Sequence, residues 1–425
     1  MKKLAIVWLA WLATAVRQKY QPRIVAVTGS VGKTTTKEMI VTVLQGSVSL
    51  RASSKNFNNE FGLPLTILDC DAPGKNIMAW LAIGWKAIGL LLIRGNYPKV
   101  LVLEMGADKP GDIDYLTRLA PPDVAVLTAL GISHLENFAT PADIVREKSY
   151  IFTNRRSGGV AILNSDDQAI ATIIGKAKPP VITYGFGDGT DIRGEDFALV
   201  ESEGVWGIRF QLHSPDDFKV PLFISGVLSR EQALASLAAI AVGLQFNIPI
   251  TTAAQRLRTF VAPRGRMKVL AGIHGSILVD DTYNAAPQSV RSALIVVQTM
   301  SQIKQLPLWI ILGDMLELGS LEQSGHADIG RLIGQLSVER LITVGQRAAT
   351  IAKSAGERGL SSDRIISFKS TAEANMYVSK HLHSAAVILV KGSQGARMEK
   401  VAKSLLQDQT KASELLVRQE AVWGK

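Results

Sequence analysis

A phosphate-binding loop is the strongest chemical signal in the sequence. Residues Thr28 to Thr36 read TGSVGKTTT, directly after an apolar run and at the start of a helical pattern. Glycines let backbone N–H groups close around phosphate oxygens, and a helix N-terminus adds partial positive charge. Lys33 would reach the terminal phosphates and the Thr34 hydroxyl would ligate Mg²⁺. The match to G-x-x-x-x-G-K-[ST] is imperfect because Val27 replaces the first glycine, but the strand–loop–helix context disfavours a simple turn with a surface lysine.

Three more side chains could complete such a site. Glu104 comes straight after the apolar run Lys99–Leu103, where a carboxylate faces the ligand crevice and suits Mg²⁺. The alternative for Glu104 is an acid at the start of a helix. His134 follows the next strand and is either a second metal ligand or a structural histidine, whereas Lys148 taken alone is a solvated lysine.

Polar groups also end two strands near the C-terminus. Asp280 to Pro287 reads DDTYNAAP and closes a strand, so its side chains either hold ribose or base or form a turn. Lys391-Gly392-Ser393 ends the last strand and is a further candidate anion site.

The elements that position these residues form an α/β pattern. Short apolar runs alternate with helical stretches from residue 23 onward, which predicts a mostly parallel sheet covered on both faces. Residues 191–224 alternate polar and apolar side chains and predict antiparallel hairpins at the edge. Predicted strands and helices are 23–27, 33–44, 99–103, 123–127, 141–152, 159–163, 181–184 and 229–244.

A second doubly wound domain follows the segment Pro263–Arg266, which resembles a linker. Its predicted strands are 276–279, 309–312, 341–344, 365–368 and 386–390, with long helices between them. We therefore predict a basic apolar N-terminal segment (1–22), a central ATPase domain (23–262, with an apolar insertion at 72–98) and a Rossmann-like C-terminal domain (263–425).

Composition excludes several classes of protein. Hydrophobic residues make up 47% of the 425, so the chain is not disordered. One cysteine excludes a disulfide scaffold or a multi-cysteine zinc module. The net charge is +10, but the sequence has no run of five or more basic residues, which argues against a nucleic-acid partner.

Two apolar segments, 4–16 and 78–93, are too short to span a bilayer. No acidic residue occurs from 1 to 37 or from 72 to 103, and four of the seven tryptophans lie in the two segments. One interpretation is peripheral contact with a membrane surface, and the other is two helices packed on each other or on the core.

The sequence resembles the Mur ligase family, ATP-dependent amide ligases of peptidoglycan synthesis. The matching stretches cover almost the whole chain from Arg23, and the C-terminal ones are similar to the branch that adds D-alanyl-D-alanine. They are TGSVGKTTTKE (28–38), NFNNEFGLPLTIL (56–68), LEMGADKPGDI (103–113), HLENF (134–138), EKSYIF (147–152), DDTYNAAPQSV (280–290), LGDMLELG (312–319) with His326, and VKGSQGARME (390–399).

The resemblance implies a function and a set of site residues. It implies ATP and Mg²⁺ as cofactors, an acyl-phosphate intermediate, and addition of D-Ala-D-Ala to a muramoyl-tripeptide in the cytoplasm, at the inner face of the membrane if the apolar segments bind there. The implied catalytic residues are Lys33, Glu104, His134 and Lys148, the last as a lysine that the family can carbamylate. The implied metal ligands are Thr34, Glu104 and His134, and the implied nucleotide contacts are Gly29, Ser30, Val31, Gly32, Lys33, Thr34, Thr35, Arg266, Asp281 and Asn284.

Departures from the family pattern leave alternatives open. Residues 228–235 read LSREQALA, so only Gln232 could replace the asparagine that meets adenine in the family. Few residues precede the first predicted strand where the family has a UDP-binding domain, so the acceptor is expected to be UDP-linked with fewer contacts or lipid-linked. The rival functions are a folylpolyglutamate-type ligase and a non-catalytic nucleotide-binding partner in cell-wall assembly.

Overall fold

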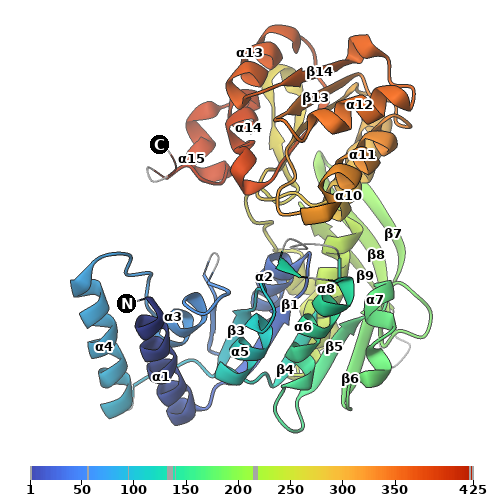
Figure 1. The fold of residues 1–425 in the computed structure, drawn as a ribbon. Coiled ribbons are helices and arrows are strands. Elements are labelled where there is room, and N and C mark those ends of the chain that lie inside the picture. Colours follow the sequence, from blue (N-terminus) through green and yellow to red (C-terminus); the bar gives the residue numbers. More distant parts are fainter. Residues whose placement is uncertain are drawn as a thin grey trace.

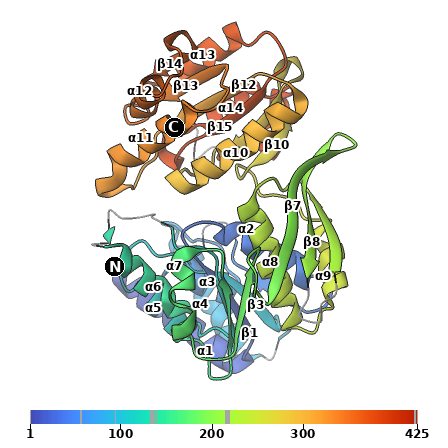
Figure 2. The same cartoon turned by 90° about the vertical axis from the view of Figure 1, so that its right-hand side faces the viewer.

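The computed structural model describes residues 2–54, 57–93, 95–131, 137–138, 140–213, 219–420 and 423. Two sheets with separate cores build the described chain, and Figures 1 and 2 show the second sheet and its helices above the first. Both sheets are mostly parallel with helices on both faces, so the predicted α/β architecture is confirmed.

The first sheet has the strand order β2-β3-β1-β4-β5-β6-β7-β8-β9. Strands β1 to β7 pair in parallel and β7, β8 and β9 are antiparallel, so the predicted hairpins extend the same sheet. The strands are β1 (Arg23–Thr28), β2 (Leu50–Ala52), β3 (Val100–Glu104), β4 (Val124–Leu127), β5 (Val160–Asn164), β6 (Val181–Gly185), β7 (Ile192–Ser202), β8 (Val205–His213) and β9 (Lys219–Ser225).

Helices bury both faces of this sheet. One face packs on α2 (Lys33–Leu44), α8 (Arg230–Leu244) and α9 (Ile250–Leu257). The other packs on α1 (Lys2–Tyr20), α3 (Gly62–Leu68), α5 (Asp112–Leu119) and α6 (Pro141–Thr153), with α4 (Ile77–Leu92) outside α1. The short α7 (Gln168–Ala171) and the 3₁₀ turn η2 (Ile174–Lys176) follow β5.

The second sheet has the order β10-β11-β15-β12-β13-β14 and is parallel except for β10. Sequence patterning missed β10, which is a short antiparallel edge strand. The strands are β10 (Lys268–Ala271), β11 (Ile277–Asp281), β12 (Leu308–Gly313), β13 (Arg340–Val344), β14 (Ile365–Phe368) and β15 (Val387–Lys391); the helices are α10 (Pro287–Lys304), α11 (Glu322–Ile333), α12 (Ala349–Glu357), α13 (Thr371–His381), α14 (Glu399–Leu405) and α15 (Ala412–Leu415).

Short 3₁₀ turns complete the second domain: η3 (Ile273–Gly275), η4 (Gly319–Leu321), η5 (Ser362–Arg364), η6 (Gln394–Ala396) and η7 (Gln409–Lys411). The carboxyl ends of β11 and β15 are neighbours, and Asp281 is in register with Lys391. The polar groups that end these two strands therefore meet at one sheet edge.

Candidate active site

The loop between β1 and α2 is held by the end of β4. The Ser30 amide donates to the Ala129 carbonyl at 2.8 Å, and the Thr128 hydroxyl donates to the Val31 carbonyl at 2.6 Å. A Cβ at Gly29 would lie 2.0 Å from the Thr128 hydroxyl oxygen, so only glycine fits this close approach. Gly32 precedes α2 with a φ of 87°, which glycine adopts at little cost. The loop thus has the fixed, glycine-dependent path of a phosphate-binding turn.

Lys33 begins α2 beside this loop. Its ammonium donates to the Gly29 carbonyl at 2.8 Å. Burial lowers the pKa of Lys33, the Glu104 carboxylate raises it, and the Arg266 guanidinium lowers it further. Lys33 is therefore a cation that has lost part of its hydration, a state in which its attraction to a phosphate is strengthened.

Glu104, the last residue of β3, connects three elements. It is 3% exposed and accepts hydrogen bonds from the Thr34 hydroxyl at 2.9 Å and the Asn58 amide at 3.2 Å. Arg266 donates to the same Thr34 hydroxyl at 3.1 Å. The helix-start alternative for Glu104 is wrong, because the next helix begins at Asp112. Sequence reasoning gave no role to Asn58, although it lies in the asparagine-rich run 56–59.

The Thr34 and Glu104 oxygens suit Mg²⁺, which prefers oxygen ligands and keeps several waters or substrate phosphates. Within the described residues no group of three or more His, Cys, Asp or Glu side chains could hold a metal. Thr34 and Glu104 would supply two oxygens to such an ion, whose other ligands would be water or phosphate oxygens. His134 lies outside the described residues.

Lys148, on α6, is buried rather than solvated. Only 3% of it is exposed, and its ammonium lies 3.4 Å from the same Gly29 carbonyl that accepts from Lys33. Burial lowers its pKa to about 7, and repulsion from Lys33 acts in the same direction. The neighbouring Glu147 accepts from the Gly111 and Ile113 amides and so anchors α6 to the start of α5.

The low pKa of Lys148 predicts a pH-dependent stability. Between about pH 7 and pH 10.5 the folded protein holds Lys148 neutral while the unfolded chain still binds the proton. Raising the pH in this window therefore favours the folded state, by up to about 1.4 kcal/mol per pH unit. In urea titrations in bicarbonate-free buffer, the free energy of unfolding of the wild type should rise with pH relative to Lys148→Met. The control Lys109→Met, at an exposed site, should show the same pH dependence as the wild type. If the difference in the free energy of unfolding between the wild type and Lys148→Met does not change with pH, the low pKa of Lys148 is contradicted.

The C-terminal domain contributes a buried ion pair. The Lys391 ammonium lies 2.6 Å from the Asp281 carboxylate and donates to the Asn284 carbonyl at 2.8 Å. The other Asp281 oxygen accepts from the Met267 amide at 3.1 Å. The predicted anion site at Lys391 is thus already paired with an acid, and this pairing was not found from the sequence.

A cavity of about 450 Å³ joins the two domains. Ser30, Val31, Gly32, Lys33, Thr34 and Thr35 line it from the loop, and Asn58, Glu104, Arg266, Asp281, Asn284 and Lys391 line it from other elements. Arg266, the last residue of the predicted linker segment, reaches Thr34 and also stacks on Tyr283, with its guanidinium carbon 4.0 Å from the ring centre. The structure therefore gathers the predicted residues that it describes around the loop and this cavity.

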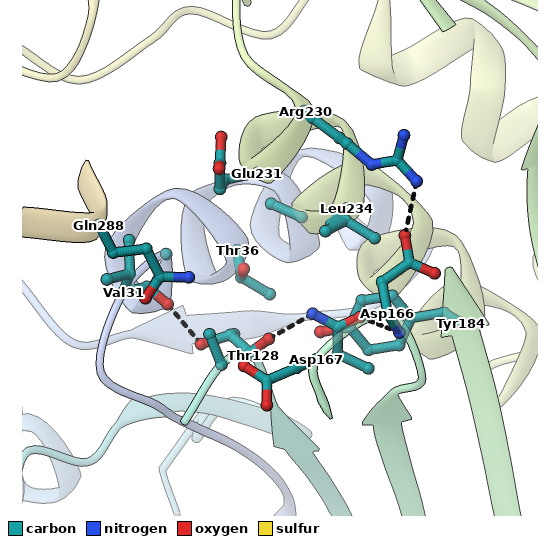
Figure 3. Close-up of a pocket in the computed structure, with 14 residues that line it drawn as sticks. Val31, Thr36, Thr128, Asp166, Asp167, Tyr184, Arg230, Glu231, Leu234 and Gln288 are labelled. Atoms are coloured by element: carbon teal, nitrogen blue, oxygen red, sulfur yellow. Dashed lines mark hydrogen bonds and ion pairs between the residues drawn. The ribbon is translucent and has the colours of Figure 1, made fainter. Parts of the chain in front are cut away.

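A smaller pocket of about 200 Å³ lies between Val31 and Gly32 of the loop and the residues around Tyr184. Figure 3 shows Thr36, Thr128, Tyr184 and the Arg230–Asp166 ion pair around it. The buried Thr36 hydroxyl has no hydrogen-bond partner among the described residues. The pocket therefore offers a polar group to a ligand next to the phosphate loop.

The side chain of Gln232 helps to begin helix α8. Its side-chain oxygen accepts from the Leu228 and Ser229 amides, and the Ser229 hydroxyl accepts from the Gln232 amide. These bonds form a capping box at the start of α8, so this oxygen is already committed to the helix N-terminus.

Two family models match most of the chain. The Mur ligase middle domain matches residues 27–243, and the model described as Mur ligase, glutamate ligase domain matches residues 265–394. The chain belongs to the Mur ligase family. The resemblance of the sequence motifs to this family is thereby confirmed.

Relatives of the chain include ligases that are named for their substrates. The UDP-N-acetylmuramoyl-tripeptide–D-alanyl-D-alanine ligase of Bacillus subtilis is 30% identical, over 94% of this chain and 79% of the relative. A MurF crystal structure from Acinetobacter baumannii is 26% identical, covers 95% of this chain and 81% of its own, and has a TM-score of 0.78. MurF from Thermotoga maritima in complex with ADP is 25% identical, with coverages of 96% and 84% and a TM-score of 0.76.

Proposed function

We propose that this Mur ligase adds D-Ala-D-Ala to a muramoyl-tripeptide in peptidoglycan precursor synthesis, with cleavage of ATP. The observation that carries the proposal is the cavity in which Lys33, Thr34 and Glu104 of one domain face Asp281 and Asn284 of the other. Relatives named for this reaction are similar over nearly the whole chain, which supports this substrate class. The reaction places the protein in the cytoplasm, where ATP is available.

ATP would lie along the loop, with its phosphates over the start of α2 and its base in the smaller pocket (Figure 3). The two pockets share Val31, Gly32 and Glu231, so one nucleotide can occupy both. The solved relative with ADP supports a nucleotide in this fold. Asn284 and Asp281 would meet the nucleotide from the C-terminal side, and Gly29, Ser30, Val31, Gly32 and Thr35 from the loop.

The protein's side chains would act on charge and position. Lys33 and Arg266 offset the negative charge that develops as the γ-phosphate passes to the substrate carboxylate, releasing ADP. The amine of D-Ala-D-Ala then attacks the acyl carbon, an amide bond forms, and phosphate leaves. Thr34 and Glu104, with His134 as a further ligand, would hold a Mg²⁺ ion, which when bound neutralises charge on the phosphates.

The domain division fits this scheme. We propose three units: residues 1–22, residues 23–262 with the insertion 72–98, and residues 263–425. The central unit would bind the phosphates of ATP, and the C-terminal unit would bring the amine of D-Ala-D-Ala to the acyl phosphate. Closure of one over the other excludes water, which would otherwise hydrolyse the acyl phosphate.

Lys148 would take a distinct role in this site. Its lowered pKa, about 7, leaves a neutral amine near neutral pH, the form that reacts with CO₂ to give a carbamate. A carbamate at this buried position would put a negative charge beside Lys33, where it could ligate a second Mg²⁺ ion.

The function is tested by phosphate release from ATP with D-Ala-D-Ala and a UDP-linked or lipid-linked muramoyl-tripeptide. Release that requires both substrates supports the proposal. Release with glutamate instead would favour the folylpolyglutamate-type reaction, and ATP binding without acceptor-dependent hydrolysis would favour a non-catalytic partner.

Glu104→Gln should lower kcat/KM at least about a hundredfold and raise the Mg²⁺ concentration needed for half-maximal activity. The amide keeps the size of the side chain but removes the charge that holds the ion. Glu203→Gln, at an exposed turn between β7 and β8, is the matched control and should behave like the wild type. A Glu104→Gln enzyme with an unchanged Mg²⁺ titration would remove Glu104 from the metal site.

A further inference from the structure

Helix α4 is apolar on two opposite faces. Its inner side buries Ile83 and Ala87 against the rest of the domain. Its outer side exposes Met78, Leu81, Trp85, Ile88 and Leu92, which recur at helical spacing, and Trp85 is 73% exposed. A helix that is hydrophobic all round is ordinarily buried, so the outer face of α4 lacks the polar cover expected of a solvent-facing surface.

Helix α1 extends this apolar surface. Trp8 and Trp80 pack with ring centres 6.3 Å apart at one end, and Lys19 donates to the Leu90 and Leu91 carbonyls at the other, so α1 and α4 run side by side in the same direction (Figure 1). The exposed apolar residues of α1 are Leu4, Val7, Trp8 and Trp11. We call these residues, with Ile77, Met78, Leu81, Trp85, Ile88, Leu92 and Ile93, the α1–α4 surface.

The helices that carry the α1–α4 surface contain basic residues and no acids. Neither helix contains an acidic residue, and Lys19 and Lys75 are exposed at its borders. The acids that precede α4 in sequence are Asp69 and Asp71, and Asp69 is paired with Lys86 at 3.0 Å. The two segments therefore carry more basic than acidic residues, and this excess complements an anionic partner.

We propose that the α1–α4 surface docks flat on an anionic lipid bilayer. Exposed tryptophans and leucines enter the boundary between head groups and acyl chains, while lysines at the edge attract anionic head groups. Among the described helices none is long and apolar enough to cross a membrane, so the contact is peripheral. A protein groove would bury the apolar stripe equally well, but the tryptophans and the lysine border favour lipid.

The position of this surface leaves the cavity accessible. Figure 1 places α1 and α4 at the lower left and the C-terminal domain at the top, away from them. Docking through α1 and α4 therefore holds the central domain at the bilayer while the C-terminal domain remains clear of it.

The test measures binding of the full chain to vesicles, without ATP or substrates, so its outcome is independent of the ligase reaction. The probes are vesicles of phosphatidylglycerol and phosphatidylcholine in equal proportion and vesicles of phosphatidylcholine alone. The wild type should float with the anionic vesicles and bind them at least about tenfold more tightly than the neutral ones. Leu81→Glu/Trp85→Glu should abolish flotation, because both side chains are exposed and the change places acids on the docking face.

The matched control is Ile295→Glu/Met376→Glu, two exposed apolar residues on the C-terminal domain. It should bind vesicles like the wild type, and circular dichroism and thermal unfolding should show that both double variants are folded. Equal binding by the Leu81/Trp85 variant, or no binding by the wild type, would overturn the proposal. A wild-type dimer that the Leu81/Trp85 variant converts to a monomer, with no vesicle binding, would assign the surface to self-association.

Discussion

Lys33→Ala should lower kcat/KM for ligation by at least about a thousandfold. The lysine is the only basic side chain inside the loop sequence from Thr28 to Thr36, and its ammonium already lies at the Gly29 carbonyl. Removing one neutral hydrogen-bond donor that stabilises the charge of a transition state lowers the rate by about 10²–10³. Lys33 would place a desolvated positive charge at the phosphoryl group, and such a charge stabilises the transition state more than a neutral donor does. Phosphate release with both substrates present measures the loss.

The control for this variant is Lys109→Ala, which removes an exposed lysine on the segment after β3. Both variants should keep the far-ultraviolet circular dichroism spectrum of the wild type, because the helix start at Lys33 is held by backbone bonds such as that from Thr36 to Gly32. Ligation by a folded Lys33→Ala enzyme at more than a tenth of the wild-type rate would show that the loop does not carry the reaction.

The strands were the most predictable part of the fold. Buried parallel strands are short, continuous apolar runs, and the predicted strand 123–127 differs by one residue from β4 (Val124–Leu127), all of whose residues are buried. β10 was missed because Lys268–Ala271 begins with a lysine and has a single buried residue, which leaves too short an apolar run to recognise. Glu104 was placed one residue after its strand, whereas pairing with Val27 keeps it inside β3.

The phosphate loop could also be predicted, because its function depends on residues that are adjacent in sequence. The environment of Lys148 could not, since its burial results from α6 packing against a loop that precedes it by more than one hundred residues. The same limit applies to Arg266, whose bond to Thr34 spans 232 residues. Family resemblance supplied these two residues, while their geometry came only from the structure.

Neither the sequence patterns nor the family resemblance predicted the ion pair of Asp281 and Lys391. The two residues are 110 apart, and each alone is an ordinary charged residue at the end of a strand. They meet because β11 and β15 are parallel neighbours in register at this position. This register, rather than any local motif, determines that the C-terminal wall of the cavity contains a buried charge pair.

Lys391→Met should destabilise the C-terminal domain by about 3–5 kcal/mol, because it leaves the 7% exposed Asp281 carboxylate buried without its counter-ion. The loss is measured as the decrease in the free energy of unfolding of the C-terminal domain in urea titrations. Asp281→Asn/Lys391→Met should recover most of it, since both charges are gone and the amide oxygen can still accept from the Met267 amide. The control Lys411→Met breaks an exposed pair with Asp408 and should cost less than about 1 kcal/mol. If the double variant is no more stable than Lys391→Met, the loss comes from packing around the lysine stem rather than from the unpaired acid.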